Sequence, residues 1–491
     1  MIAKIKSAFS GKARRPAPTY RRNYQIGDQG RLLDSWFSGS LTADEAIFSK
    51  MTVGRNRARD LERQNPFARR FLQMSATNVV GPHGIALQPL ARRADGALDE
   101  ADNAALLESW RAWGKVGSCT IDHRLAWPEV QAMLLRRVLV DGEAMLRLIR
   151  GADNASGFAV QIVDATLLDE NKTQDRGRGR VKIVMGVEVD KNDRPVAYHF
   201  KKSASALGAE TETTRVPASE IVHLYLQERP DQTRGFTWLA PSAVRVKMLD
   251  AFEEAAVVAA RVAACKMGFF TSEEGAAFQG DGAGDGLSVL TDVEPGSLQA
   301  LEAGQNFQAF DPAWPPNNFA EFEKELKRGI ASGWGVNYTT LANDLEGVNY
   351  SSIRQGELAD RDFWRCLQQF LVRHLADVVY GEWLLMALSA GSVQGAGGPL
   401  PLARLDKFRA RSWRPRGWQW VDPAKEISAA RDSFLLRQKS LTDLAAEQGL
   451  DFAETARQIK EDIALAERLG LSLPGNDAAP GAAMGDETNE G

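Results

Sequence analysis

The sequence predicts an α+β fold in the first half of the chain and a mainly helical second half. In the first 235 residues, helical periodicity at 55–79 and 127–140 gives way to alternating, β-branched stretches at 143–149 and 180–200. From Trp238 onward the apolar spacing is mostly helical. The chain has 491 residues, more than one hydrophobic core usually supports, so we expect several lobes.

Local signals predict the elements of the first lobe. Helices are expected at 41–50 and 55–79, with a break at Asn65-Pro66, because proline is favoured in the first turn of a new helix. Further helices are expected at 103–114 and 127–140. A loop and strand are expected within 78–89, and strands at 143–149, 158–168, 180–190, 195–200 and 221–226, with a hairpin turn at 191–194.

The second half begins with a long predicted helix, 238–267, in which Pro241 is tolerated because it lies near the start. Thirty residues at about 1.5 Å each give roughly 45 Å, enough to connect separate regions. A second helix is expected at 317–332, with an apolar face that includes Phe322 and Ile330. The residues between them, 269–316, are Gly-rich, acidic and strand-like in places, which predicts a small module carried on two helices.

The stretch "NDLEGVNYSSIRQGELADRDFW" begins as a polar loop around Gly347 and continues as a helix. Ser352 and Gln355 have the spacing of a capping box. The helix offers Leu358 as its only large apolar side chain between 354 and 362. A buried face is then expected, formed by Phe363, Leu367, Phe370, Leu371, Leu375 and Val378. This helix is therefore anchored at its far end and polar at its near end.

The C-terminal part reads as a linker at 391–398 followed by two helices at 423–438 and 451–469, with Gly470 as a C-cap. The residues after 471 are rich in Gly, Ala and acids, which predicts a disordered tail.

Charge is distributed unevenly along the chain. Residues 1–27 carry seven Lys or Arg and no acid, which predicts a basic flexible arm, whereas residues 267–323 carry ten acids and no Lys or Arg. Three dispersed cysteines argue against a disulfide framework. No secretory signal is recognisable, and the apolar run at 255–270 is too short and too charged for a membrane span.

Common catalytic and nucleotide-binding signatures are absent: the sequence has no GxxxxGK[ST], HExxH, GxSxG or CxxC. Two function classes, a nuclease and a DNA-binding regulator, are not excluded by these absences. A nuclease could use Asp281, Asp285 and Asp292, although no Lys or His lies near them in sequence to orient a water. A helix-turn-helix regulator could use "SLTDLAAEQGLDFAETARQI", although its second helix carries acids that would face phosphates with the wrong sign.

The order of these elements resembles the portal proteins of tailed bacteriophages, specifically the lambda-type family of head-tail connectors. The strings that carry the resemblance are "RARDLERQNPFARRFLQMSATNVVGPHGI", "DGEAMLRLIRG", "QTRGFTWLAPSAVRVKMLDAFEEAA", "LEGVNYSSIRQGELADRDFWRCLQQFL" and "RGWQWVDPAKE". They occur in the family's order from about Tyr20 to Leu471.

The resemblance implies a portal-type fold that assembles as a ring oligomer, with about twelve subunits at one capsid vertex and no enzymatic activity or cofactor. Its parts would be an α+β wing, long stem helices, a small α/β clip, a kinked tunnel helix and a helical crown. The boundaries would be 1–25 for the arm, 26–235 for the wing, 236–268 and 317–336 for the stem, 269–316 for the clip, 337–390 for the tunnel loop and long helix, 391–422 for the linker and wing return, 423–471 for the crown and 472–491 for the tail.

The resemblance also implies sites and partners. The tunnel loop facing double-stranded DNA, without sequence specificity, would be Asn343, Asp344, Leu345, Glu346, Gly347, Val348 and Asn349. The clip acids facing the terminase large subunit and the head-completion (adaptor) proteins would be Glu273, Glu274, Asp281, Asp285, Asp292 and Glu294. The major capsid protein, or a scaffold or protease, would be a further partner, within a virion assembled in the host cytoplasm and without a membrane.

Overall fold

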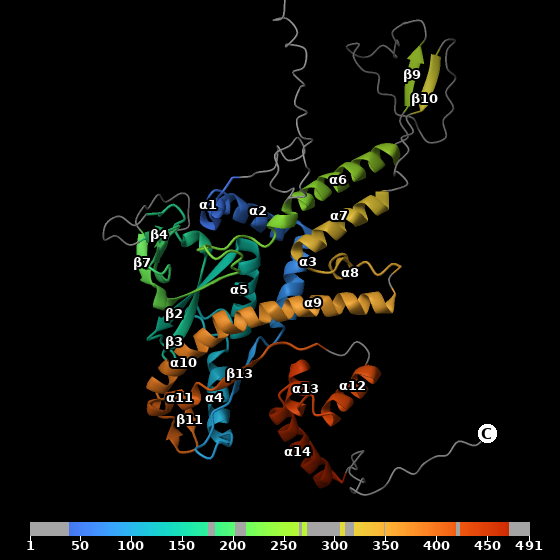
Figure 1. The fold of residues 1–491 in the computed structure, drawn as a ribbon. Helices are drawn as coiled ribbons and strands as arrows, with labels where there is room; N and C mark the ends of the chain where they lie inside the picture. The colour runs from blue at the N-terminus through green and yellow to red at the C-terminus, as the bar shows by residue number, and fades with distance from the viewer. Residues whose placement is uncertain are drawn as a thin grey trace, which may run out of the picture.

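The computed structural model of the chain describes residues 39–174, 182–201, 213–264, 268–272, 305–309, 319–347, 349–418 and 423–470 (Figure 1). These residues form a mixture of helices and small antiparallel sheets, which confirms the α+β class. The predicted basic arm and the tail after 471 lie outside the described residues.

Three helices open the described chain: α1 (Ala43–Phe48), α2 (Met51–Gln64) and α3 (Pro66–Ser75). The predicted break is confirmed. Asn65 is the N-cap of α3, and its side-chain oxygen accepts the Ala68 N–H at 2.9 Å. A π-helical turn, η2 (Ala76–Val80), continues α3 and ends at Gly81.

A three-stranded sheet, in the order β3-β2-β8, packs beside these helices. It consists of β2 (Glu143–Arg150), β3 (Phe158–Val163) and β8 (Ile221–Tyr225). Helix α5 (Trp127–Asp141) turns into β2 at Gly142, whose φ of 88° favours glycine. The core between α4 (Glu100–Trp113), α5 and α10 (Asp377–Ser389) contains an aromatic cluster around Trp110. The Trp110 ring lies 4.7 Å from that of Trp113 and 5.1 Å from that of Trp383.

A second, four-stranded sheet corrects one sequence expectation. The stretch 180–190 was expected to be one strand, but it contains two, β4 (Lys182–Val184) and β5 (Val187–Val189), joined by a tight turn. Both turn residues, Met185 and Gly186, have positive φ. The predicted hairpin to β6 (Pro195–Lys201) is confirmed, while β7 (Thr213–Pro217) was not predicted.

Residues 391–414 return to the first lobe. They contain a short hairpin, β11 (Gln394–Gly395) and β12 (Gly398–Pro399), a helical turn η6 (Leu402–Arg404), helix α11 (Leu405–Phe408) and strand β13 (Arg411–Arg414). Strand β13 pairs with β1 (Ala86–Pro89), more than 300 residues earlier in the chain.

Two helices, α6 (Ala240–Ala264) and α7 (Phe319–Trp334), run side by side away from the sheets (Figure 1). They approach closely because α7 presents Gly329 and Gly333 to α6: a Cβ on Gly333 would lie 2.0 Å from the Ser242 hydroxyl. Ser242 Oγ also donates to the Ile330 carbonyl at 3.0 Å. Beyond these helices the structure describes the antiparallel pair β9 (Gly268–Ser272) and β10 (Gln305–Ala309).

The long helix α9 (Tyr350–Leu371) continues through a π-helical turn, η5 (Val372–Ala376), into α10 (Asp377–Ser389). Leu367, Leu371 and Leu375 are buried as expected, but Val378 is 40% exposed. The π turn adds a residue, so the buried face moves on by one position, to Val379 and later residues.

Three C-terminal helices complete the described chain: α12 (Pro423–Leu435), α13 (Leu441–Glu447) and α14 (Phe452–Leu469). The first and last correspond to the two predicted helices, and Gly470 is a left-handed C-cap with φ of 68°, as expected. Helix α13 between them was not predicted as a separate helix.

A fully buried carboxylate, Glu143 at the start of β2, lies at the junction of these parts. Its Oε1 accepts Arg55 Nη2 at 2.8 Å and also pairs with Arg234, and its Oε2 lies 3.0 Å from His223 Nε2. Burial alone would raise the pKa of Glu143. The charge and hydrogen bonds of Arg234, the hydrogen bond of His223 and the charge of Arg55 hold this pKa well below its ordinary value of 4.5. The cluster joins α2, β2, β8 and the segment that leads into α6.

We expect Glu143→Gln to lower the free energy of unfolding by about 3 to 5 kcal/mol, because two buried arginines lose their carboxylate. Since the native pKa is depressed, the ionised pair stabilises the wild type above pH 4.5, and this contribution is lost as the pH falls below that value. Urea denaturation at pH 7 and at pH 3.5 measures both effects: the difference between the two proteins should be smaller at the lower pH.

Glu220→Gln is the matched control. Its partner Arg147 is 41% exposed, so this change should cost about 0 to 1 kcal/mol. An equal decrease in the free energy of unfolding in the two variants would show that the buried cluster contributes no more than an exposed ion pair.

Candidate nucleic-acid interface

The loop singled out in the sequence lies between short helix α8 (Tyr338–Ala342) and α9. Asn337 is the N-cap of α8, and its backbone N–H donates to Asp360 Oδ1 of α9 at 2.9 Å. A Cβ on Gly356 would lie 1.7 Å from the Asn337 amide nitrogen, so α9 passes very close to the start of α8. The base of the loop is therefore held against the helix that follows it.

Asp344 does not extend freely from this loop. The Tyr338 hydroxyl donates to Asp344 Oδ2 at 2.6 Å, and Lys324 Nζ of α7 lies 3.0 Å from the same oxygen. The hydrogen bond from Tyr338, then that from Lys324, lowers the pKa of Asp344 to about 2. The carboxylate thus stays charged and ties the loop to the second long helix.

The other loop residues are exposed. Asn343 is the left-handed C-cap of α8 with φ of 54°, Leu345 is 61% exposed, and Gly347 has φ of 67° with open space around it. Glu346 is exposed and contributes a second carboxylate to the loop. Val348 lies outside the described residues.

Asn349 begins α9, which corrects the predicted capping box. Its side chain accepts the Ser352 N–H at 2.8 Å, so the helix starts three residues before the Ser352 cap that the sequence suggested. On the polar half of α9, Arg361 Nη2 lies 3.8 Å from Glu357 Oε2, at i,i+4 spacing. Leu358 is 41% exposed, as a polar helix end requires.

The predicted clip acids, Glu273, Glu274, Asp281, Asp285, Asp292 and Glu294, lie outside the described residues. So do the three aspartates of the nuclease alternative. In the part of the chain that the structure describes, no three His, Cys, Asp or Glu side chains are grouped so that they could hold a metal ion. Among the described helices, none combines the length and apolarity of a membrane span.

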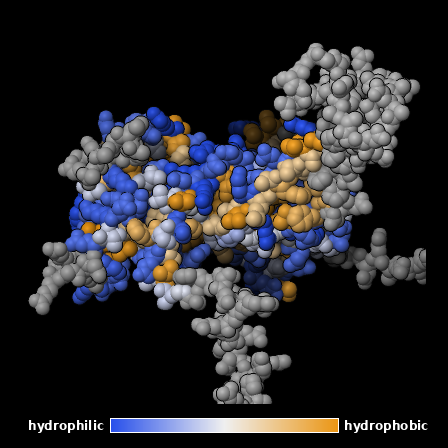
Figure 2. Space-filling view, turned by 90° about the horizontal axis from the view of Figure 1, so that it is seen from above, coloured by the Kyte–Doolittle hydropathy of each residue, from blue (hydrophilic) through white to orange (hydrophobic). Residues whose placement is uncertain are grey.

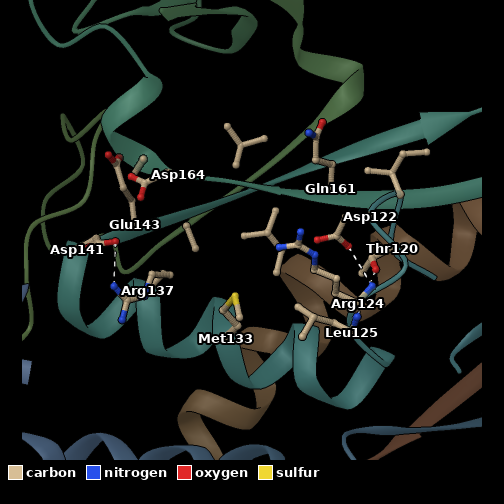
Figure 3. A pocket seen from close by; sticks show the side chains of 15 residues that line it. Thr120, Asp122, Arg124, Leu125, Met133, Arg137, Asp141, Glu143, Gln161 and Asp164 are labelled. Carbon is tan, nitrogen blue, oxygen red and sulfur yellow. Dashed lines mark hydrogen bonds and ion pairs between the residues drawn. The ribbon is translucent and has the colours of Figure 1, made fainter. Parts of the chain in front are cut away.

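A pocket of about 430 Å³ lies between α5 and strands β2 and β3 (Figure 3). Its charged side chains have partners within the chain: Asp141 lies 2.7 Å from Arg59 and 3.6 Å from Arg137. The Thr120 hydroxyl lowers the pKa of Asp122 at the other end of the pocket. Arg59 also lies 2.9 Å from Asp164, so ion pairs within the chain hold these carboxylates of the pocket.

The helix-turn-helix alternative is opposed by the contacts of α13 and α14. Asp451 caps α14, and its carboxylate lies 2.9 Å from Arg414 Nη1 of β13. A Cβ on Gly417 would lie 2.2 Å from the carbonyl carbon of Gln448 in the turn between the two helices. The N-terminal end of α14, which a recognition helix would place in the major groove, is thus docked on the protein itself.

Residues 29–368 match the family model described as phage portal protein, lambda family. The chain belongs to the lambda family of phage portal proteins. The chain is 33% identical to the probable portal protein of Halomonas phage phiHAP-1 over 470 residues. The match covers 94% of this chain and 90% of the relative. The chain is 22% identical over 489 residues to portal protein B of Escherichia phage lambda, covering 88% of each chain.

Solved structures similar to this portal protein include the neck of an empty gene transfer agent particle. The identity is 15% and the TM-score 0.44, covering 80% of this chain and 93% of that chain. The family match and the named relatives identify the portal protein as a structural component of the head-tail connection of a virion.

The sequence did not reveal how the candidate loop is held. Lys324, Tyr338 and Asp360 fix its base, but they lie on three different helices, and no spacing rule links Lys324 to Asp344. Asn349 could have been found, since asparagine is among the favoured N-cap residues.

We expect Asp344→Asn to free the loop, because the amide cannot pair with the Lys324 ammonium. Hydrogen exchange of residues 343–349 should become faster than in the wild type. Asp362→Asn, at an exposed position of α9, should leave the exchange unchanged. Identical exchange in all three proteins would contradict the tether.

Proposed function

We propose that about twelve copies of the chain close into a ring at one capsid vertex, and that double-stranded DNA passes through this ring during packaging and ejection. In this proposal residues 26–235 with 391–422 form the wing, α6 and α7 the stem, 269–316 the clip, and the C-terminal helices the crown. The chain acts as a conduit and does not catalyse a reaction. The pairing of β13 with β1 supports assigning residues 391–422 to the wing.

The observation that carries the proposal is an exposed apolar stripe on α6. Val244 is 70% exposed, Met248 is 67% exposed and Val258 is 51% exposed, and the exposed Ala251 and Ala255 lie between them. The spacing alternates between four and three residues, as in helices that pack against another helix along a seam. Figure 2 shows apolar side chains gathered along this helix.

Helix α7 does not cover this stripe. It packs on the opposite side of α6, where Ser242, Val246 and Leu249 are buried. A helix with one apolar face buried within its own chain and a second one exposed indicates a protein contact. A neighbouring copy is the occupant that ring formation supplies, and repetition of the contact closes the ring.

The loop between α8 and α9 suits a position at the DNA. The exposed residues Asn343, Leu345, Glu346 and Gly347 carry no positive charge. A ring of Lys or Arg side chains would neutralise phosphates, release counterions and hold DNA tightly. A loop of Asn, Gly and acids can narrow the channel without gripping its contents.

The proposed partners follow from the same arrangement. The acidic residues of the clip suit a basic protein surface, which we assign to the terminase large subunit during packaging and to head-completion proteins afterwards. The wing would contact the major capsid protein or a scaffold or protease during assembly in the host cytoplasm. With no nucleotide-binding motif in the sequence, the energy for packaging would come from the terminase.

Met248→Glu tests the ring. A carboxylate at the middle of the stripe should leave the chain folded, because the side chain is exposed, but should abolish the closed oligomer through desolvated, like-charged contacts. Native mass spectrometry and circular dichroism measure the two properties.

Lys247→Glu, one residue away and also exposed, is the control and should still assemble. Wild-type protein that stays monomeric under assembly conditions would contradict the proposal.

Glu346→Lys tests the loop. The variant should form rings normally, because the loop tip is exposed, but should impair packaging or ejection because a ring of cations now grips DNA. DNA content of particles and salt-dependent DNA binding are the measurements. Glu346→Gln is the control, and failure of Glu346→Lys to form rings would place the loop in an interface between subunits.

A further inference from the structure

A second pocket, of about 700 Å³, is lined by polar and aromatic side chains. It lies beside strand β8, the ends of β5 and β6, the segment 226–233 and the turn η5. Its aromatic residues come from distant parts of the chain: Tyr198, His223, Tyr225, Phe370 and His374. The proposed conduit uses none of them.

The aromatic side chains form two packed groups. The ring of His223 lies 4.7 Å from that of Tyr225 and 5.5 Å, nearly perpendicular, from that of Tyr198. On the other side the ring of Phe370 lies 5.1 Å from that of the exposed His374. Such walls suit an inserted aromatic ring, and also a guanidinium, which is attracted to aromatic faces.

Carboxylates prevail among the charged residues of the pocket. Asp44, Asp193 and Asp231 line it together with Lys182, which lies 3.4 Å from Asp193. Arg229, at the rim, lies 3.5 Å from Asp231. A ligand with a positive charge near an aromatic group therefore fits both the walls and the rim.

The described chain begins at the rim of this pocket. The Leu41 carbonyl accepts Arg229 Nη1 at 3.2 Å, and the Ala43 N–H donates to Asp231 at 2.9 Å. Asp44 accepts the Thr233 N–H at 2.8 Å. These contacts fix residues 41–44 beside the segment 229–233. The pocket is therefore within reach of the residues that precede Leu41 in the sequence.

The sequence immediately before this point is "RLLDSWF", residues 31–37. It offers Trp36 and Phe37 for the aromatic walls and Arg31 as the nearest upstream cation. Phe37 is four residues from Leu41, a reach of up to about 14 Å, and Arg31 is ten residues away, up to about 36 Å. The aromatic anchors thus need only a short excursion to enter the pocket.

We propose that residues 31–37 of the same chain dock in this pocket, with Trp36 and Phe37 between the aromatic walls and Arg31 at the acidic rim. Trp and Arg are the residues that most often anchor protein contacts. Docking would bridge β8 and the turn after α9, two elements that approach each other at this pocket. The inference does not depend on ring formation.

A photo-crosslinking amino acid, p-benzoylphenylalanine, in place of Phe37 of the full-length chain tests the proposal. After irradiation, mass spectrometry should locate the crosslink on residues that line the pocket. An equal mixture of unlabelled and nitrogen-15-labelled chains separates links within one chain from links between chains. We expect crosslinked peptide pairs in which both peptides are unlabelled or both are labelled, because the link forms within one chain.

The double variant His374→Ala and Asp193→Asn, made in the crosslinking chain, should reduce the yield at the pocket by about tenfold, as loss of two anchor contacts implies. The matched control, Arg373→Ala and Asp95→Asn, changes exposed residues outside the pocket and should leave the yield unchanged. Crosslinks spread over the surface, crosslinks to a second chain, or equal yields in the two variants would each overturn the proposal.

Discussion

A carboxylate buried in the first lobe constrains much of the remaining structure, because a charge removed from water must be met by cations. Arg55 of α2 and Arg234 of the segment before α6 meet this requirement for Glu143, and His223 of β8 adds a hydrogen bond. They can converge only when helix, sheet and segment have assembled. Since Arg234 lies six residues before α6, the same cluster determines where the long helix leaves the lobe.

Sequence reasoning succeeded where the signal was local. The break at Asn65, the Gly470 cap and the two long helices follow from caps, proline and apolar spacing, and all agree with the structure. It failed where the decisive contact was distant or the backbone unusual. The turn at Met185 requires a positive φ, which a methionine in the sequence does not indicate. The π turn before Val378 displaced the expected buried face.

The candidate loop shows the same division. Its polarity and the helix after it could be predicted, because polar loop residues and apolar residues at helical spacing form a pattern in the sequence. The inward orientation of Asp344 was not, because it depends on Lys324 of a helix placed by packing at Gly329 and Gly333. A residue that looked like free negative charge is instead one of the groups that hold the loop in place.

The three C-terminal helices have almost no interior of their own. Leu435 of α12 is 62% exposed and Leu469 of α14 is 63% exposed, and within the described part of α14 only Ala466 is buried. In a solitary chain this part would open far more readily than the sheets, since local stability follows the apolar surface that is covered. In the proposed ring, neighbouring copies would cover these helices, and dilution would then loosen them before it affects the rest of the molecule.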